Sequence, residues 1–586
     1  MKLLVSSSLW FNILKRQKLV RCFSHAQPTI SKSYFFKNGT VPLSCLTIGE
    51  VLDKTADDYG DHILHISHHQ GISKSYLNVR NEAEKLASGL IACGLRKGDR
   101  LGIYSPNCIE WPIAQYAAAK AGLIAVAINY ACQPSELEYC LKKTSCKAVV
   151  SYDKLKHQNY YDVFKAIIPN LENSDPMNLQ SEKLPNLKFI IMLSDDTKEG
   201  IIRYKDVMNM GNKESDTILE EVKKHLKFDD LLNIQYTSGT TGAPKAAGLS
   251  HHNIVTGAVS SLQAMEYSAE EHSIGCCQVP LFHLFGVMFG IFWPLFKKQT
   301  IVLPSSVHDG EKNLEAIEKY RCNLAVGTPT MFIDVLRIHE QMKSDVSSLK
   351  HALLSGAAIP EGVLNGLYND FKFSTIQRAY GLSEGTAAVA LTSLNSNRDE
   401  VLGGFMEPVA GIEVKIIDSE DQLVPRNVTG EICTRSRLVF QGYWGDQEAT
   451  AKAIDKFGWL HTGDIGIMND KGWINIVGRF KDIVIRGGEN ICVIEIENFL
   501  SCHPAILESY ICGVPDERLG EELCCWIHVK PGMTLTEEDV RKFCQGKISY
   551  YKIPRYILFV DEFPKTKTGK AQKHEMAKIS IEKLGL

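Results

Sequence analysis

A run of small and hydroxyl-bearing residues that ends in a lysine is the first feature of this sequence that could do chemistry. Six of its nine residues are Ser, Thr or Gly, and the run reads Thr237, Ser238, Gly239, Thr240, Thr241, Gly242, Ala243, Pro244, Lys245. Glycines let backbone N–H groups approach an anion closely, hydroxyl groups add further donors, and a lysine supplies a positive charge. The composition therefore predicts a loop that holds phosphate.

Two other kinds of loop have a similar composition. One is a solvated turn, but the apolar run from Leu232 to Tyr236 directly precedes the loop and reads as a buried strand. A P-loop requires Gly-x-x-x-x-Gly-Lys followed by Ser or Thr. Here Pro244 precedes Lys245, and Ala246 stands where the metal-binding hydroxyl would be. The P-loop pattern therefore fails.

Four later charged residues are candidates for a role beside this loop. Glu384, in the segment 380–384, is a hard oxygen ligand of the kind that suits magnesium on phosphates. Asp464, in the segment 462–464, is a carboxylate, a group that can accept hydrogen bonds from two adjacent hydroxyls. Arg479 and Lys570 are candidate cations. In isolation each is more often an ordinary surface or salt-bridge residue, so their weight comes from their order along the chain.

In that order, these segments resemble the core motifs of the adenylate-forming superfamily, which includes acyl-CoA synthetases, luciferases and peptide-synthetase adenylation domains. The resemblance extends from about residue 46 to residue 575. Within the superfamily the chain most resembles mitochondrial medium-chain acyl-CoA ligases, through its first residues, Gln235-Tyr236 and the segment 250–254. Two departures stand out: Ala246, where the family usually has Gly, and Cys492-Val493, where relatives often have Tyr-Pro.

The resemblance implies an enzyme that activates a carboxylic acid with ATP and Mg²⁺ to an acyl-adenylate, releasing pyrophosphate, and then transfers the acyl group to CoA. It assigns the loop to the pyrophosphate, Tyr380 to the adenine, Glu384 to magnesium and catalysis, and Asp464 and Arg479 to the ribose. It also makes Lys570 the catalytic lysine that reaches the carboxylate and the phosphate. It places a hinge at Lys481 and the CoA tunnel at Gly487, Gly488 and Glu489.

The acyl pocket is implied by three further segments. The segment 280–286, with Phe282 and His283, resembles the part of the family that lines the acyl site, and the resemblance makes His283 a candidate catalytic residue. A histidine among aromatic residues is, however, often only a hydrogen-bonded core residue. Gly327, Gly356 and Ala357 resemble other pocket walls, and such small residues leave room for an unbranched chain. We therefore expect a medium-chain fatty acid as substrate. The alternatives are an aryl or luciferase-like acid, a carrier-protein acceptor, and a non-catalytic relative that binds acyl or adenylate ligands.

The fold predicted from the pattern is α/β, with a large N-terminal domain of parallel-rich sheets covered by helices. Buried strands are expected at 101–104, 123–128, 148–151 and 187–193, and a helix is expected to open at Ser105-Pro106-Asn107 and run to about Ala121. Near residue 478 the sequence pattern changes to a mixture of strand-like runs and helical stretches. We predict an AMP-binding domain over 46–478, a hinge over 479–482, and a small mobile α+β lid domain over 483–586.

The first residues have a composition of their own. No Asp or Glu occurs before Glu50, whereas basic residues and serines are frequent. This is typical of a mitochondrial transit peptide, which we place at 1–23, with a secretory signal as the weaker alternative. Its removal would take the formal charge from -3 to -8. The predicted location is the mitochondrial matrix.

The overall composition excludes several classes of protein. Of 586 residues, 44% are hydrophobic and 23% charged, and a net charge of -3 argues against nucleic acid as a partner. The 17 cysteines show no Cys-x-x-Cys spacing, so we expect buried, reduced thiols. We expect no membrane-spanning segment, and read 280–296 as buried. The oligomeric state is left open.

Overall fold

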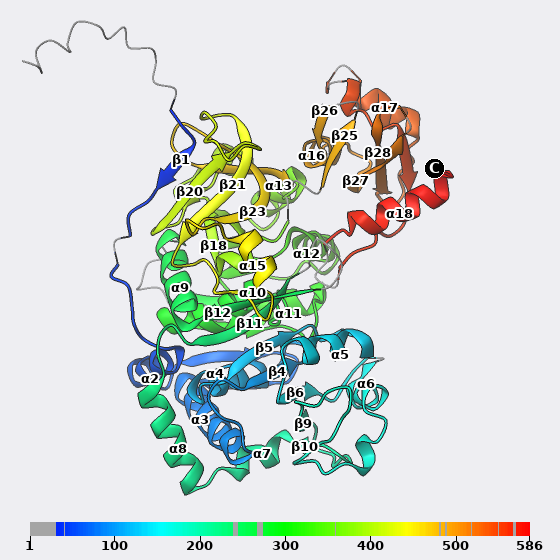
Figure 1. Cartoon of the computed structure of the whole chain (residues 1–586). Coiled ribbons are helices and arrows are strands. Elements are labelled where there is room, and N and C mark those ends of the chain that lie inside the picture. The colour runs from blue at the N-terminus through cyan, green and yellow to red at the C-terminus, as the bar shows by residue number, and fades with distance from the viewer. Residues whose placement is uncertain are drawn as a thin grey trace, which may run out of the picture.

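The computed structural model of the chain describes residues 31–586 except 40, 157, 238–243, 266–272, 358, 480–481, 487–488, 517, 546, 549 and 567–569. The expected transit peptide, 1–23, therefore lies outside the described residues. Within that part of the chain the architecture is α/β, as predicted (Figure 1).

An eight-stranded sheet carries the strand that leads into the phosphate loop. Its order is β10 (Ile202–Arg203), β9 (Phe189–Leu193), β6 (Ala148–Tyr152), β4 (Arg100–Tyr104), β5 (Ile124–Ile128), β11 (Leu231–Thr237), β12 (Lys245–Ser250) and β22 (Gly442–Tyr443). The strands from β10 to β11 are parallel, whereas β12 and β22 pair antiparallel. The predicted buried strands are thus confirmed.

A nine-stranded sheet lies beside it. Its order is β19 (Glu407–Pro408), β18 (Ala388–Leu391), β17 (Thr375–Gly381), β16 (His351–Leu354), β15 (Leu324–Gly327), β13 (Ser273–Cys277), β14 (Gln299–Leu303), β2 (Ile63–Ser67) and β3 (Ile72–Ser75). The strands from β17 to β2 are parallel. A third, antiparallel sheet has the order β1 (Tyr34–Phe36), β20 (Ile412–Ile417), β21 (Thr429–Ser436), β23 (Leu460–Met468) and β24 (Ile474–Arg479).

The alternation of side chains shows how the first two sheets are layered. On β5, Ala125 and Ala127 join a central core that also includes Leu353 of β16, so both sheets face this core. Ile124 and Val126 face an outer core on the other side, as expected for parallel strands buried on both faces.

Helices fill the layers between and outside the sheets. The central core contains α2 (Ile48–Tyr59), α4 (Glu110–Lys120) and α9 (His251–Met265). The outer core of the eight-stranded sheet contains α5 (Pro134–Lys143) and α6 (Tyr160–Ile167). The outer core of the nine-stranded sheet contains α11 (Gly310–Tyr320), α12 (Pro329–Met342) and α13 (Glu361–Asn369).

The helix expected from Ser105 begins instead at Glu110. Asn107 accounts for the difference, because its amide group donates to Val279 O at 3.0 Å and its carbonyl accepts from Leu281 N at 2.8 Å. These bonds join the segment after β4 to the segment after β13. The sequence pattern of one segment could not reveal a bond to another.

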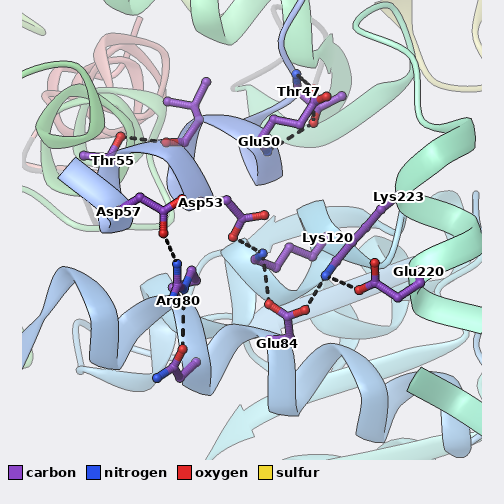
Figure 2. Close-up of polar contacts among 12 residues, drawn as sticks. Thr47, Glu50, Asp53, Thr55, Asp57, Arg80, Glu84, Lys120, Glu220 and Lys223 are labelled. Carbon is purple, nitrogen blue, oxygen red and sulfur yellow. Dashed lines mark hydrogen bonds and ion pairs between the residues drawn. The ribbon is translucent and has the colours of Figure 1, made fainter. Parts of the chain in front are cut away.

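A buried lysine joins four helices on one side of the large domain (Figure 2). Lys120 of α4, only 1% exposed, forms ion pairs with Asp53 of α2 and with Glu84 of α3 (Tyr76–Ala92). Glu84 also pairs with Lys223 of α8 (Lys213–His225), and Lys223 lies 2.7 Å from Glu220. A buried charge is tolerated when it is paired in this way.

The C-terminal part forms a sheet of its own, orange to red in Figure 1. Its order is β26 (Glu489–Cys492), β25 (Ile483–Arg486), β28 (Gly520–Val529) and β27 (Ile506–Asp516), and β29 (Tyr556–Phe559) also pairs with β28. Its helices are α16 (Val493–Ser501), α17 (Glu537–Cys544) and α18 (Lys573–Leu584), and its two hydrophobic clusters draw only on residues from 484 onward. The domain limits, with a hinge over 479–482, stay a prediction.

The expectation of buried cysteines holds in the part of the chain that the structure describes. Fifteen cysteines have described side chains, and twelve of them are buried. No described helix combines the length and apolar character needed to cross a membrane. The segment 280–296 forms short buried helical turns, including α10 (Leu284–Val287).

Candidate active site

Neighbouring strands of the nine-stranded sheet bring the predicted acyl-site segments to one edge. Phe282 and His283 follow β13, Gly327 ends β15, Gly356 and Ala357 follow β16, and Tyr380 lies near the end of β17. These four strands are parallel and adjacent, so their carboxyl ends meet at the same edge. In open α/β sheets this edge is where ligands bind.

The predicted ribose carboxylate lies at the centre of a hydrogen-bonded group. Antiparallel pairing of β23 with β24 sets Asp464 directly opposite Arg479. Arg479 Nε lies 2.5 Å from Asp464 Oδ1, and the Tyr380 hydroxyl donates to Asp464 Oδ2 at 2.7 Å. Asp464 is only 2% exposed. Burial and the charge of Asp464 raise the pKa of Tyr380, so its phenol remains a donor at neutral pH. The sequence motifs did not predict the Tyr380–Asp464 bond.

A second group surrounds the predicted magnesium ligand. Glu384 lies in a 3₁₀ turn, Ser383–Gly385, and its Oε1 accepts from the Tyr443 hydroxyl at 2.7 Å. Lys245 Nζ lies 4.9 Å from the centre of the same aromatic ring. Tyr443 belongs to β22, which pairs with the β12 strand that Lys245 begins. Burial, followed by the charge of Glu384, raises the pKa of Tyr443, which keeps its phenol protonated.

Tyr443 was missed by sequence reasoning. It lies 59 residues from Glu384 along the chain and in no segment that we compared with a family motif. Its position becomes evident only when β22 pairs with β12. Glu384, held by the phenol whose ring Lys245 contacts, offers the hard oxygen donor that magnesium prefers, so the residues present fit this ion.

Part of the phosphate loop can be placed. Thr237 ends β11 and Lys245 begins β12, whereas Ser238 to Ala243 lie outside the described residues. Pro244 O accepts from the Tyr139 hydroxyl at 3.0 Å. Ala246, the departure from the family pattern, is fully buried in an outer-core cluster, and its carbonyl accepts from Trp444 N at 2.7 Å. The alanine is thus part of the packing of β12.

The charge of the predicted catalytic lysine, Lys570, affects the pKa of the acyl-site histidine, His283. His283 precedes α10, where its Nδ1 accepts from Phe285 N at 3.3 Å, and part of the residue remains exposed. The surrounding protein and then the charge of Lys570 lower the pKa of His283 to about 4, so its imidazole is neutral at physiological pH. Lys570 itself is exposed, and its backbone N–H donates to Thr566 Oγ1 at 3.1 Å. The charge of Lys570 thus reaches the His283 segment, and the catalytic role of this lysine stays a prediction.

Aromatic contact joins the edges of the two large sheets at the predicted acyl pocket. The ring of Phe282 lies 5.6 Å from that of Tyr130, which follows β5. A β-carbon at Gly327 would lie 3.2 Å from Phe332 and 3.3 Å from Gln278, so close packing already explains this glycine. Gly356 has φ +90°, a conformation that favours glycine. The roles of these residues as pocket walls stay predictions.

Most of the predicted hinge and CoA-binding residues fall outside the described part of the chain. Lys481, Gly487 and Gly488 lie outside the described residues, and of Glu489 only the backbone is described, in β26. Their assignments stay predictions.

Comparison with known proteins identifies the family. The model of the AMP-binding enzyme family matches residues 52–444, and that of the AMP-binding enzyme C-terminal domain matches residues 495–570. The chain belongs to the AMP-binding enzyme family, which confirms the resemblance seen in its motifs.

Among individual relatives, the chain is 39% identical over 562 residues to "Medium-chain acyl-CoA ligase ACSF2, mitochondrial" of Danio rerio, covering 95% of this chain and 92% of the relative. It is 38% identical over 542 residues to the Homo sapiens protein of the same name, covering 91% and 87%.

Two solved structures share the fold. The anthranilate CoA ligase AuaEII in complex with anthranoyl-AMP has a TM-score of 0.81 at 23% identity, covering 93% of this chain and 99% of that one. ATP-bound MatB from Rhodopseudomonas palustris has a TM-score of 0.77 at 23% identity, covering 91% and 99%.

Proposed function

We propose that this protein is a medium-chain fatty acid–CoA ligase of the mitochondrial matrix. Its broader class is shown by its family and its relatives: it is an AMP-forming acid–CoA ligase. The proposed reaction joins a fatty acid to ATP as an acyl-adenylate with release of pyrophosphate, and then transfers the acyl group to CoA with release of AMP. The observation that carries the proposal is the pair of hydrogen-bonded groups around Asp464 and Glu384, which meet at the end of β17 because Tyr380 and Glu384 are four residues apart there.

Each group has a distinct task in the proposed first step. Asp464 and Arg479 hold the ribose, while Tyr380 lies along the adenine and also orients the carboxylate of Asp464. Lys245 and the loop before it bind the pyrophosphate part of ATP, whose charge would otherwise repel the incoming carboxylate. Magnesium, when bound at Glu384, supplies further charge neutralisation on the phosphates. Lys570 neutralises the charge that develops at the α-phosphate.

The second step requires Lys570 to withdraw. We infer that the C-terminal part rotates about Lys481 after adenylation, and that the segment around Gly487, Gly488 and Glu489 then lines the CoA tunnel. Two half-reactions that use one site in succession account for a hinge directly after the ribose-binding Arg479. The prediction is that Lys570→Ala abolishes adenylation yet leaves thioester formation from supplied acyl-adenylate largely intact. Equal loss of both steps would contradict this role.

The substrate is tested with a panel of acids. Pyrophosphate release is measured with and without CoA for fatty acids of increasing length, aryl acids and amino acids. CoA-dependent turnover that peaks at medium-chain fatty acids is expected. A peak at aryl acids would replace the proposed substrate, turnover independent of CoA would contradict the ligase step, and no turnover with any acid would favour a non-catalytic binder.

The location is proposed from the basic, acid-free first residues and from the relatives named as mitochondrial. Sequencing the amino terminus of protein isolated from mitochondria should find a mature chain that begins near Ser24. An intact first residue in that fraction would contradict a transit peptide over 1–23.

A further inference from the structure

A carboxylate, a thiol and an imidazole meet on the antiparallel sheet that carries Asp464. Their residues are Glu431 and Cys433 of β21 and His461 of β23. His461 Nδ1 lies 3.0 Å from Glu431 Oε2 and 3.6 Å from Cys433 Sγ, and one ligand atom from each residue lies within 4.8 Å of the others. These separations suit three ligands around one small cation.

Strand pairing explains why these side chains share one face. Cys433 is the direct cross-strand partner of His461, and Glu431 precedes Cys433 by two residues on the same strand. Side chains two apart on a strand point to the same face, and the irregularity between Glu431 and Cys433 adjusts the approach of the carboxylate. The cluster is thus built by register and not by a sequence motif.

Neighbouring groups orient two of the three ligands. Gly463 N donates to Glu431 Oε1 at 3.0 Å, which leaves Oε2 on the side of His461. Asp455 Oδ2 lies 3.9 Å from His461 Nε2, on the opposite side of the ring from the thiol. In the metal-free protein His461 Nδ1 donates to Glu431 Oε2, and this bond raises the pKa of His461. A cation bound between these atoms displaces that proton, and the Asp455 carboxylate then favours a proton on Nε2, as outer carboxylates do for metal-binding histidines.

The local charge also favours a cation. Burial and then the negative charges of Glu431, Asp421 and Asp455, against the positive charge of Lys415, raise the pKa of the Cys433 thiol, so the thiol keeps its proton until a cation displaces it. Cys433 is buried, whereas the side chains of His461 and Glu431 are 24% and 16% exposed. A small ion therefore has a route to the thiol along the imidazole and the carboxylate.

We propose that Glu431, Cys433 and His461 form a binding site for a divalent cation of the zinc class, with water as a fourth ligand. Thiolate and imidazole select zinc over magnesium, which prefers oxygen ligands, so this site is chemically distinct from the one at Glu384. Binding converts the Cys433 thiol to thiolate and releases its proton to solvent. The bound ion joins β21 to β23 three residues before Asp464. The site does not depend on the reaction proposed above.

The test uses the full chain after treatment with a chelator, titrated with Co²⁺ in excess Mg²⁺. Magnesium occupies sites made of oxygen ligands, so a thiolate-to-cobalt charge-transfer band reports on cysteine ligation alone. We expect this band to saturate at one Co²⁺ per chain and to disappear when Zn²⁺ is added. Zn²⁺ should also raise the Tm of the protein.

Matched variants identify the ligands. Cys433→Ala should lose the band, whereas Cys502→Ala, which removes an exposed thiol elsewhere, should keep it. Because Cys433 is buried and its variant could fail to fold, His461→Gln provides a second test, with His574→Gln as its exposed control. His461→Gln should weaken Co²⁺ binding by at least about tenfold and remove the Tm shift.

Three results would overturn the proposal. They are no charge-transfer band in the unmodified protein, a band that persists in Cys433→Ala, and unchanged cobalt affinity in His461→Gln. Any of these would leave the cluster as a His461–Glu431 ion pair beside a packed thiol.

Discussion

Removing the Tyr443 hydroxyl tests whether this residue positions Glu384 for the adenylation step. Tyr443→Phe keeps the aromatic ring under Lys245 and deletes only the 2.7 Å bond to Glu384 Oε1. The carboxylate then loses one of the groups that orient it. The proposed magnesium ligand is expected to become mobile, while the phosphate-binding lysine keeps its contact with the ring.

The size of the effect follows from the type of bond. A hydrogen bond to a charged group contributes about 1.5–3 kcal/mol, and about 1.4 kcal/mol corresponds to a tenfold change in rate. If the whole of this free energy stabilises the transition state, losing the bond would slow adenylation about 10- to 150-fold. Tyr443 contacts the predicted magnesium ligand, Glu384, and not the reacting atoms. We therefore expect adenylation to slow about tenfold and the half-maximal rate to require a higher Mg²⁺ concentration. The raised pKa of Tyr443 predicts that the effect persists throughout neutral pH.

ATP–pyrophosphate exchange with a fatty acid and without CoA measures this step directly. Tyr34→Phe is the matched control, because the Tyr34 hydroxyl also donates to a glutamate, Glu413 Oε2, at 2.7 Å but lies on the antiparallel sheet in β1. The control should exchange at the unmodified rate. Equal rates and equal Mg²⁺ dependence for both variants would refute the positioning role of Tyr443.

Three further predictions concern the ribose group, acid stability and the helix network. Asp464→Asn should raise the KM for ATP about tenfold or more, because it removes a charge between Arg479 and Tyr380, and an unchanged KM would exclude a ribose role. Burial lowers the pKa of His65 to about 4, whereas in the unfolded chain this pKa is about 6.5. As the pH drops, the unfolded state therefore binds the proton first, and the free energy of unfolding falls by up to about 3 kcal/mol between pH 6.5 and pH 4. Urea midpoints of His65→Gln should therefore fall less steeply over this range, and equal slopes would contradict the assignment. Lys120→Met should lower the free energy of unfolding by about 1–3 kcal/mol, which is less than for a fully buried pair because the side chains of Asp53 and Glu84 remain 39% and 38% exposed. Thermal melting should show this loss, while the rate of adenylation per folded molecule should not change.

Much of the architecture was predictable because its signals are local. Short apolar runs such as 148–151 and 101–104 lie within the strands β6 and β4, since strands buried on both faces need continuous hydrophobic residues. Glycine and hydroxyl residues before Lys245 are a local signal of the same kind, and the phosphate role that they indicate stays a prediction. The family followed from several such segments in order, and both family models match the chain.

The local pattern was least informative where a segment is held by a distant partner. Asn107 delays a helix because it bonds to the segment after β13, 172 residues away in the chain. Lys120 is an unremarkable helical lysine in the sequence, yet it is buried among carboxylates from two other helices.

The amino-acid sequence by itself therefore determined the fold class, the family and the identity of Lys245, Glu384, Asp464, Arg479 and Lys570 as candidates. The tertiary structure decided how some of these candidates are held. It brought Tyr443 to Glu384, Tyr380 to Asp464, and Glu431, Cys433 and His461 to one another. The physical reason is strand register: pairing across a sheet fixes which side chains meet, and that pairing depends on the packing of the whole core and not on the residues beside each one in the chain.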